Sequence, residues 1–164
     1  MGRTMLRKQI LKERPVGPMA RPGEKDIAAL ATVLVTAEAA DHPIDNAFDS
    51  QRGPGGSRWV AGEPGEQTLI LAFDTPQTIH AISLEVEELE VSRTQELSLA
   101  VSRDGGQTYQ ELLRQEYNFS PPGTTFEREE WSVTAEGVTH LQLVIKPDKG
   151  GKPCQATLTA LALR

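Results

Sequence analysis

The sequence predicts an all-β domain, built as an antiparallel β-sandwich of about eight strands. Apolar and polar residues alternate in short runs along most of the chain, which is the periodicity of strands with one buried face. The 14 glycines and 11 prolines supply turns between the runs. No segment of crossover-helix length separates the runs, so a parallel α/β arrangement has little support. With 38% apolar residues in 164, the chain has enough material for one core.

Each predicted strand carries apolar residues at every second position, as Leu69, Leu71 and Phe73 do. The intervening positions, among them Glu85, Glu87 and Gln95, are expected to face water. In the last run the alternation changes parity near Ala160, which indicates a bulge there or a strand buried on both faces. The predicted strands cover residues 31–36, 67–73, 78–87, 95–101, 107–113, 129–134, 140–146 and 155–163.

Charge divides the chain into a basic arm, residues 1–25, and an acidic domain, residues 26–164. The arm has seven basic residues against Glu13 and Glu24, a charge of +5, so the formal −6 of the whole chain leaves −11 on the domain. An acidic domain repels phosphate backbones and anionic membranes, so we expect no nucleic acid on its surface. The arm, which contains three prolines, is expected to be extended.

Cysteine content and hydropathy predict a cytoplasmic protein. The single cysteine, Cys154, has no partner for a disulfide within the chain, and small secreted β-domains often depend on disulfides. The basic start has no apolar stretch long enough for a secretory signal, and the longest apolar-rich stretch, residues 27–35, is too short to span a membrane.

A series of short motifs then narrows the class. Asp45-Asn46-Ala47-Phe48-Asp49 is followed by Arg58-Trp59, by a strand ending in Phe73-Asp74, and by the hairpin Ser102-Arg103-Asp104-Gly105-Gly106. In order and spacing, residues 30–164 resemble the discoidin (coagulation factor 5/8 type C) branch of the galactose-binding-like family. The resemblance implies a jelly-roll β-sandwich that binds a ligand, most often a glycan, through loops at one end.

The leading functional hypothesis is therefore a non-catalytic module that binds carbohydrate through its end loops. Its candidate residues combine hydrogen-bonding groups for hydroxyls with aromatic faces for stacking: Asp41, His42, Arg52, Arg58, Tyr117 and Phe119. Tyr117 and Phe119 are assigned to a loop before Pro121-Pro122-Gly123, whereas Trp59 and Trp131 are expected in the core.

Two other functions stay open. The first is an intracellular protein-interaction or scaffold domain, as in members of the superfamily that serve DNA-break repair and ubiquitin-ligase complexes. The second is a small hydrolase that uses the acidic residues Glu85, Glu87, Glu88 and Glu90. The three histidines lie far apart in sequence and offer no ligand-spaced partner for zinc.

The resemblance also implies a structural calcium ion under the Asn-Ala-x-Asp turn, with Asn46 and Asp49 as the matching residues. Many members of the family add a glutamate from the closing strand, where this chain places Ala160. Calcium needs six to eight oxygen ligands, so we expect weak or absent binding. The alternative is that Asp45, Asn46 and Asp49 cap their own turn.

Overall fold

The structure, a computed structural model, describes residues 23–49 and 51–164. Eight strands account for most of it, and the only helical segments among these residues are single turns. In chain order the elements are α1 (Ile27–Leu30), β1 (Ala31–Val35), η2 (Ile44–Ala47), β2 (Trp59–Val60), β3 (Gln67–Glu87), β4 (Arg93–Ser102), β5 (Gln110–Phe119), β6 (Phe126–Lys146), β7 (Thr157–Leu158) and β8 (Ala160–Leu163).

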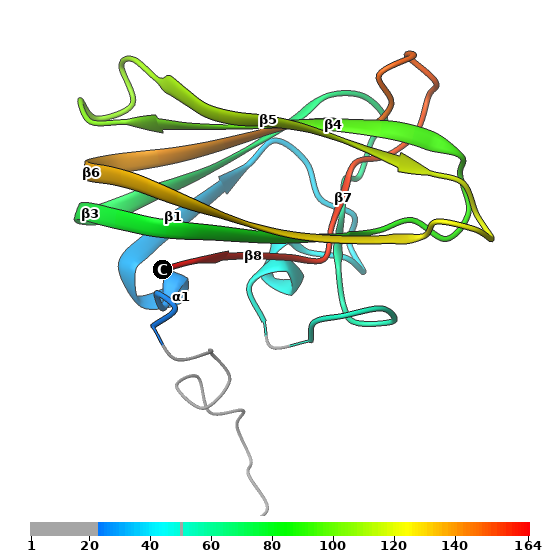
Figure 1. Cartoon of the computed structure of the whole chain (residues 1–164), viewed down its shortest axis with the longest axis horizontal. Coiled ribbons are helices and arrows are strands. Elements are labelled where there is room, and N and C mark those ends of the chain that lie inside the picture. Colours follow the sequence, from blue (N-terminus) through cyan, green and yellow to red (C-terminus); the bar gives the residue numbers. More distant parts are fainter. Residues whose placement is uncertain (1–22, 50) are drawn as a thin grey trace, which may run out of the picture.

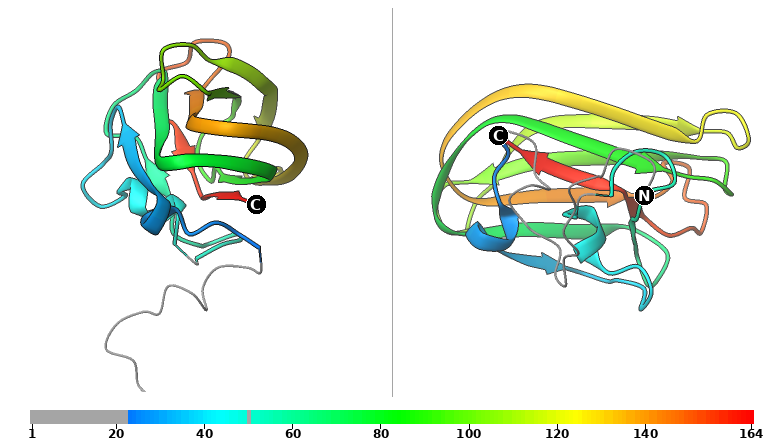
Figure 2. Two further views of the ribbon diagram at one scale, coloured as in Figure 1. Left: turned by 90° about the vertical axis from the view of Figure 1, so that its left-hand side faces the viewer. Right: turned by 90° about the horizontal axis from the view of Figure 1, so that it is seen from below.

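Two long strands, β3 and β6, join the two layers of the sandwich (Figure 1). The first half of β3 pairs with β1 and with the second half of β6, which in turn pairs with β4, and β4 with β5. The second half of β3 pairs with the first half of β6 and with β8. All pairs are antiparallel, and Figure 2 shows β3 and β6 curving from one layer into the other.

The sequence divides this region differently. It predicts separate strands at 67–73 and 78–87, and again at 129–134 and 140–146, whereas the structure joins each pair into one strand. The register between β3 and β6 shifts three times between Ala72 and Ala81. Such irregularities bend a strand without ending it, and Pro76, which donates no hydrogen bond, lies at this exposed bend. The count of eight is reached instead through the short strands β2 and β7.

The predicted inner faces are confirmed. The alternating apolar residues of four predicted strands, which lie in β3, β4 and β6, are all buried, and burying each contributes roughly 1.5–3 kcal/mol relative to leaving it in water. Trp59 is 1% exposed, and Trp131 is half-buried against the core. The core residues predicted by the alternation are Leu69, Leu71, Phe73, Ile82, Leu84, Val86, Leu97, Leu99, Val101, Leu141, Leu143 and Ile145.

The closing segment is buried on both faces and changes partner at Thr159. Residues 156–163 are all buried. Before Thr159 the chain pairs with β2, and after it with β3. The parity change near Ala160 therefore marks the transfer of the chain from one strand pair to the other.

Three residues assigned to the solvent face are buried, which corrects the sequence interpretation: Glu85, Glu87 and Gln95 are 5%, 4% and 0% exposed. The segment around Gly53 and Gly55 covers the outer face of β3, and its amides donate to the two glutamates. Gln95 has the same parity as Leu97, so it points inward, where its side chain donates to the Thr157 carbonyl.

The segment Ser102–Gly106 lies in the hairpin connection between β4 and β5, as its sequence predicts. The side chain of Asp104 accepts hydrogen bonds from the Thr108 hydroxyl, from the Ser102 hydroxyl and from the amides of Gln107 and Thr108. These bonds, the Thr108 hydroxyl first, hold the pKa of the exposed Asp104 carboxyl well below its usual value. Gly105 and Gly106 adopt φ values of 78° and 87°, which side chains resist.

The predicted arm, residues 1–25, falls mostly outside the described residues. Its last part contacts the sandwich: the Lys25 amide donates to the Leu163 carbonyl over 2.8 Å, and Arg52 forms a two-pronged ion pair with Glu24 at 2.9 and 2.7 Å. No helix in the described part of the chain is long and apolar enough to cross a membrane.

Candidate functional site

One end of the sandwich carries an open pocket of about 560 Å³, which we call the end pocket. Residues 87–91, at the end of β3 and the start of the β3–β4 loop, form its first wall. Residues 153–155 and Thr157, from the segment that enters β7, form the second. The remainder comes from the chain around β2 and is lined by His42, Arg58, Val60 and Pro64.

The first wall is a tight turn stabilised by Glu88. Its carboxylate accepts hydrogen bonds from the amides of Glu90 and Val91 at 3.0 and 3.3 Å. Its own amide donates to the Thr125 carbonyl at the turn before β6. This turn leaves Leu89 52% exposed at the rim of the end pocket.

The second wall is ordered by Asp148 and Lys152. Asp148 accepts from the amides of Thr94 and Lys152 at 3.0 and 2.9 Å, and these bonds hold the pKa of its carboxyl below the usual value. The Lys152 ammonium donates to the Ser92 carbonyl in the β3–β4 loop. Both walls are therefore joined to each other as well as to the sandwich.

Of the six binding residues predicted from the sequence, two line the end pocket and four do not. His42 and Arg58 line the end pocket. Asp41 precedes His42, with its carboxylate 3.9 Å from the His42 ring. Arg52 is instead paired with Glu24, and that carboxylate is the main cause of its raised pKa.

Tyr117 and Phe119 do not lie in a loop, which corrects the sequence assignment. Both belong to β5, point into the sandwich and are 3% exposed. Their rings pack at a tilt of 59°, with centroids 6.5 Å apart. The sequence predicts that this strand ends at residue 113, whereas β5 continues to Phe119. Tyr117 and Phe119 occupy inward-facing positions of that continuation.

The buried Tyr117 hydroxyl leads to a prediction on alkaline stability. Burial, and then the nearby Glu129 and Glu127, raise the pKa of Tyr117 well above its usual value. As the pH rises past about 10, the unfolded chain loses this proton while the folded chain keeps it, so the free energy of unfolding falls. We expect Tyr117→Phe to lessen that fall. The hydroxyl has no hydrogen-bond partner in the described part of the chain, so the variant should cost no more than about 1 kcal/mol at neutral pH.

Urea unfolding at neutral pH and near pH 11 measures this effect. Tyr109→Phe is the matched control. Burial and then Asp104 also raise the pKa of Tyr109, but Tyr109 is less buried than Tyr117, so this variant should lessen the fall by a smaller amount. An equal loss of stability with pH in wild type and Tyr117→Phe would contradict the prediction.

The proposed metal residues form hydrogen bonds within their own segment. Asp49 accepts from the Gln51 amide and from the Ser57 hydroxyl, at 2.9 and 2.5 Å. The Asn46 side chain donates to the Arg58 carbonyl at 3.0 Å. Among the described residues no three His, Cys, Asp or Glu side chains gather as a metal site. The side chains of Asn46 and Asp49 thus fit a turn that caps itself better than they fit a calcium site. Weak or absent calcium binding stays a prediction.

Sequence reasoning missed Arg93, which lies under the end pocket, and the pocket residue Gln155. It named Glu88 only for the hydrolase hypothesis and Cys154 only as a cysteine without a disulfide partner, although both line the end pocket. A signal for Arg93 was present: it has the parity of Leu97 and Leu99 and therefore belongs to the inner face of β4. An arginine on a buried face is almost always paired, so the pattern alone predicts a partner for it.

The chain has the jelly-roll β-sandwich fold that is also seen in family 32 carbohydrate-binding modules. A module of this family from a family 31 glycoside hydrolase of Clostridium perfringens aligns with a TM-score of 0.61 and 14% identity, over 85% of this chain and 93% of that one. The family 32 module of NanJ from C. perfringens, solved in complex with galactose, aligns with a TM-score of 0.57 and 11% identity, over 85% and 96%.

A pectin-binding carbohydrate-binding module aligns with a TM-score of 0.54 and 20% identity, over 82% of this chain and 90% of that one. No model of a known protein family matches the sequence, and no curated protein matches it either. At these identities the likeness establishes the fold that the motifs predict.

Proposed function

We propose that the chain is a non-catalytic carbohydrate-binding module that holds its ligand in the end pocket. The observation that carries the proposal is the meeting of His42 and Arg58 in an open pocket at one end of the sandwich. In the sequence both residues are distant from the two walls, residues 87–91 and residues 153–155 with Thr157, that complete the pocket. The similar solved structures include modules described with galactose and with pectin binding, which supports a sugar as the ligand class.

The lining suits a polyhydroxylated ligand. The Arg58 guanidinium presents several N–H donors in a fixed plane, and the His42 ring and the Glu90 carboxylate add a donor or acceptor. Leu89, Val91 and Pro153 supply apolar surface for the C–H groups of a sugar ring. A sugar that contacts both kinds of surface is oriented by hydrogen bonds to its hydroxyls and also buries its apolar C–H groups.

Three of the four carboxylates required by the hydrolase hypothesis have structural partners. Glu85 accepts from the Gly53 amide and pairs with Arg128. Glu87 accepts from the Gly55 amide, and Glu88 pairs with Arg93. This use of the acidic residues supports binding rather than hydrolysis. A cytoplasmic location stays a prediction from the single cysteine.

The test is a glycan array with the whole chain, followed by calorimetry on the glycans that bind. We expect Arg58→Ala to weaken binding at least about tenfold, because a hydrogen bond to a charged group contributes roughly 1.5–3 kcal/mol. The matched control is Arg103→Ala, in the hairpin that follows the far end of β4, which should bind as wild type does.

Absence of binding to any glycan at millimolar concentration would overturn the proposal. Equal affinities of Arg58→Ala and wild type would place the ligand elsewhere on the molecule. Reproducible capture of a protein that carries no glycan would favour the scaffold alternative.

A further inference from the structure

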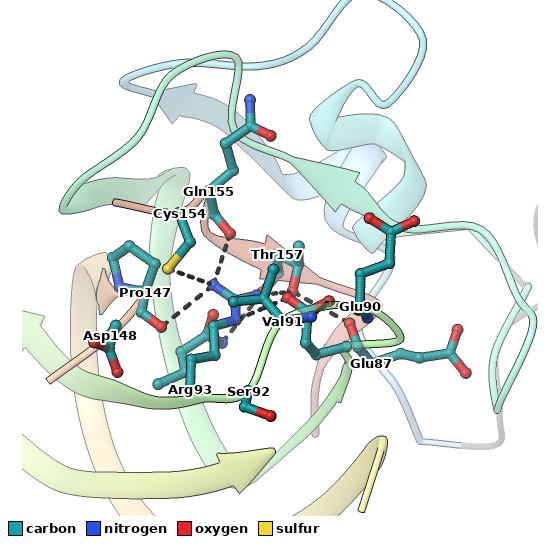
Figure 3. Close-up of polar contacts among 12 residues, drawn as sticks. Glu87, Glu90, Val91, Ser92, Arg93, Pro147, Asp148, Cys154, Gln155 and Thr157 are labelled. Atoms are coloured by element: carbon teal, nitrogen blue, oxygen red, sulfur yellow. Dashed lines mark hydrogen bonds and ion pairs between the residues drawn. The ribbon is translucent and has the colours of Figure 1, made fainter. Parts of the chain in front are cut away.

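Arg93, the first residue of β4, has a fully buried side chain beneath the end pocket. Its guanidinium contacts both walls at once (Figure 3). On one side Nε lies 2.9 Å from the Glu88 carboxylate. On the other side Nη1 donates to the Gln155 carbonyl at 2.7 Å, and Nη2 donates to the Thr157 hydroxyl at 3.2 Å.

Two weaker contacts complete the arrangement. Nη1 also donates to the Pro147 carbonyl at 3.3 Å, where β6 has just ended, and it lies 3.7 Å from the Cys154 sulfur. Glu88, Cys154, Gln155 and Thr157 all line the end pocket. One side chain therefore links the two walls, which come from distant parts of the sequence.

We propose that Arg93 is a positioning residue that fixes the separation of the two walls and so preorganises the end pocket for its ligand. The part that concerns affinity rests on the proposed function, whereas the part that concerns wall order does not. Binding to a preordered pocket avoids the entropic cost of ordering loops. The planar fork of arginine can reach a carboxylate and two further acceptors together, which the single ammonium of lysine cannot do.

Cys154 provides a direct readout of wall order. It is the only cysteine in the chain, it lines the end pocket, and it is partly buried beside the Arg93 guanidinium. The rate at which it reacts with a disulfide reagent such as dithionitrobenzoate reports how often the second wall opens. We expect Arg93→Lys to raise this rate about tenfold or more in protein that remains folded.

The control is Val101→Ala, which weakens the core at the opposite end of the same strand and touches neither wall. It separates opening of the walls from general loss of stability. An equal rise of the Cys154 rate in Val101→Ala and Arg93→Lys would overturn the inference, as would an unchanged rate in Arg93→Lys.

Hydrogen exchange locates the effect along the chain. In Arg93→Lys we expect faster exchange at residues 88–92 and 152–157 and unchanged exchange in the hairpin 102–110. Uniformly faster exchange would mean that Arg93 has only a general structural role, and it would contradict the proposal.

Two milder variants keep the test valid if Arg93→Lys does not fold. Glu88→Gln removes the ion pair with the first wall, and Thr157→Val removes one acceptor in the second. Glu88→Gln should speed exchange at residues 88–92, and Thr157→Val should speed it at 152–157. If neither variant changes local exchange, the inference is wrong.

These readouts need no sugar, so the two proposals fail separately. Opened walls in Arg93→Lys together with no glycan bound by the wild type would overturn the proposed function and leave the positioning role intact. Opened walls with glycan affinity equal to that of wild type would overturn the link between wall order and binding.

Discussion

Replacing Glu85 with alanine is expected to lower the free energy of unfolding by about 2–4 kcal/mol. The carboxylate is buried on the outer face of β3, where it accepts from the Gly53 amide at 2.7 Å and pairs with Arg128 at 3.0 Å. Removing it leaves the amide without its acceptor, and of the two glutamates only Glu87, through the Gly55 amide, still holds the segment that covers β3. Urea unfolding followed by fluorescence measures the change.

Glu130→Ala is the matched control for Glu85→Ala. Glu130 lies on the neighbouring strand, opposite Ser83, and also pairs with an arginine, Arg164. Both partners of that pair are about half exposed, and exposed pairs contribute no more than about 1 kcal/mol. Equal losses of stability in the two variants would show that the cover over Glu85 contributes nothing.

Replacing Trp59 with alanine should cost about 3–5 kcal/mol, a large share of the stability of an ordinary domain. Trp59 is 1% exposed, and its indole N–H donates to the Ala37 carbonyl at 3.0 Å. The alanine variant loses this hydrogen bond and leaves a cavity under β2. Trp59→Phe fills part of the space, so its loss should be smaller.

Trp131, the other tryptophan, remains as the fluorescent reporter in both Trp59 variants. It is half-buried on β6, so Trp131→Phe serves as the control and should cost clearly less than Trp59→Ala. If Trp59→Ala and Trp131→Phe unfold with the same free energy, the indole of Trp59 does not contribute the predicted stability.

Much of the fold follows from local pattern. Leu97, Leu99 and Val101 predict an inner face of β4 because the side-chain period of a strand does not depend on its partners. Strand ends are less well predicted. Tyr117 and Phe119 were assigned to a loop because prolines follow them, although their parity already matched the inner face of β5.

The site is harder to predict from local pattern, because its contacts join residues that are far apart in the sequence. Arg58 and His42 were found as polar residues in turn-rich segments. The roles of Arg93 and Glu88 depend on the positions of Gln155 and Thr157, far along the chain. Glu85 and Glu87 were expected in water because no local feature shows that the Gly53 segment folds over them.

The ribbon formed by β3 and β6 has a consequence for the order of folding. Its paired residues are least separated in sequence at Glu87 and Phe126, beside the end pocket, and most separated at Gln67 and Ile145. Closing a shorter loop costs less chain entropy, so pairing of this ribbon is favoured to start beside the pocket and to proceed toward the bend at Pro76. A domain dominated by such distant pairings folds in milliseconds to seconds rather than microseconds. The end of the ribbon that carries the first wall of the end pocket would then be among the first parts of the ribbon to form during synthesis or refolding.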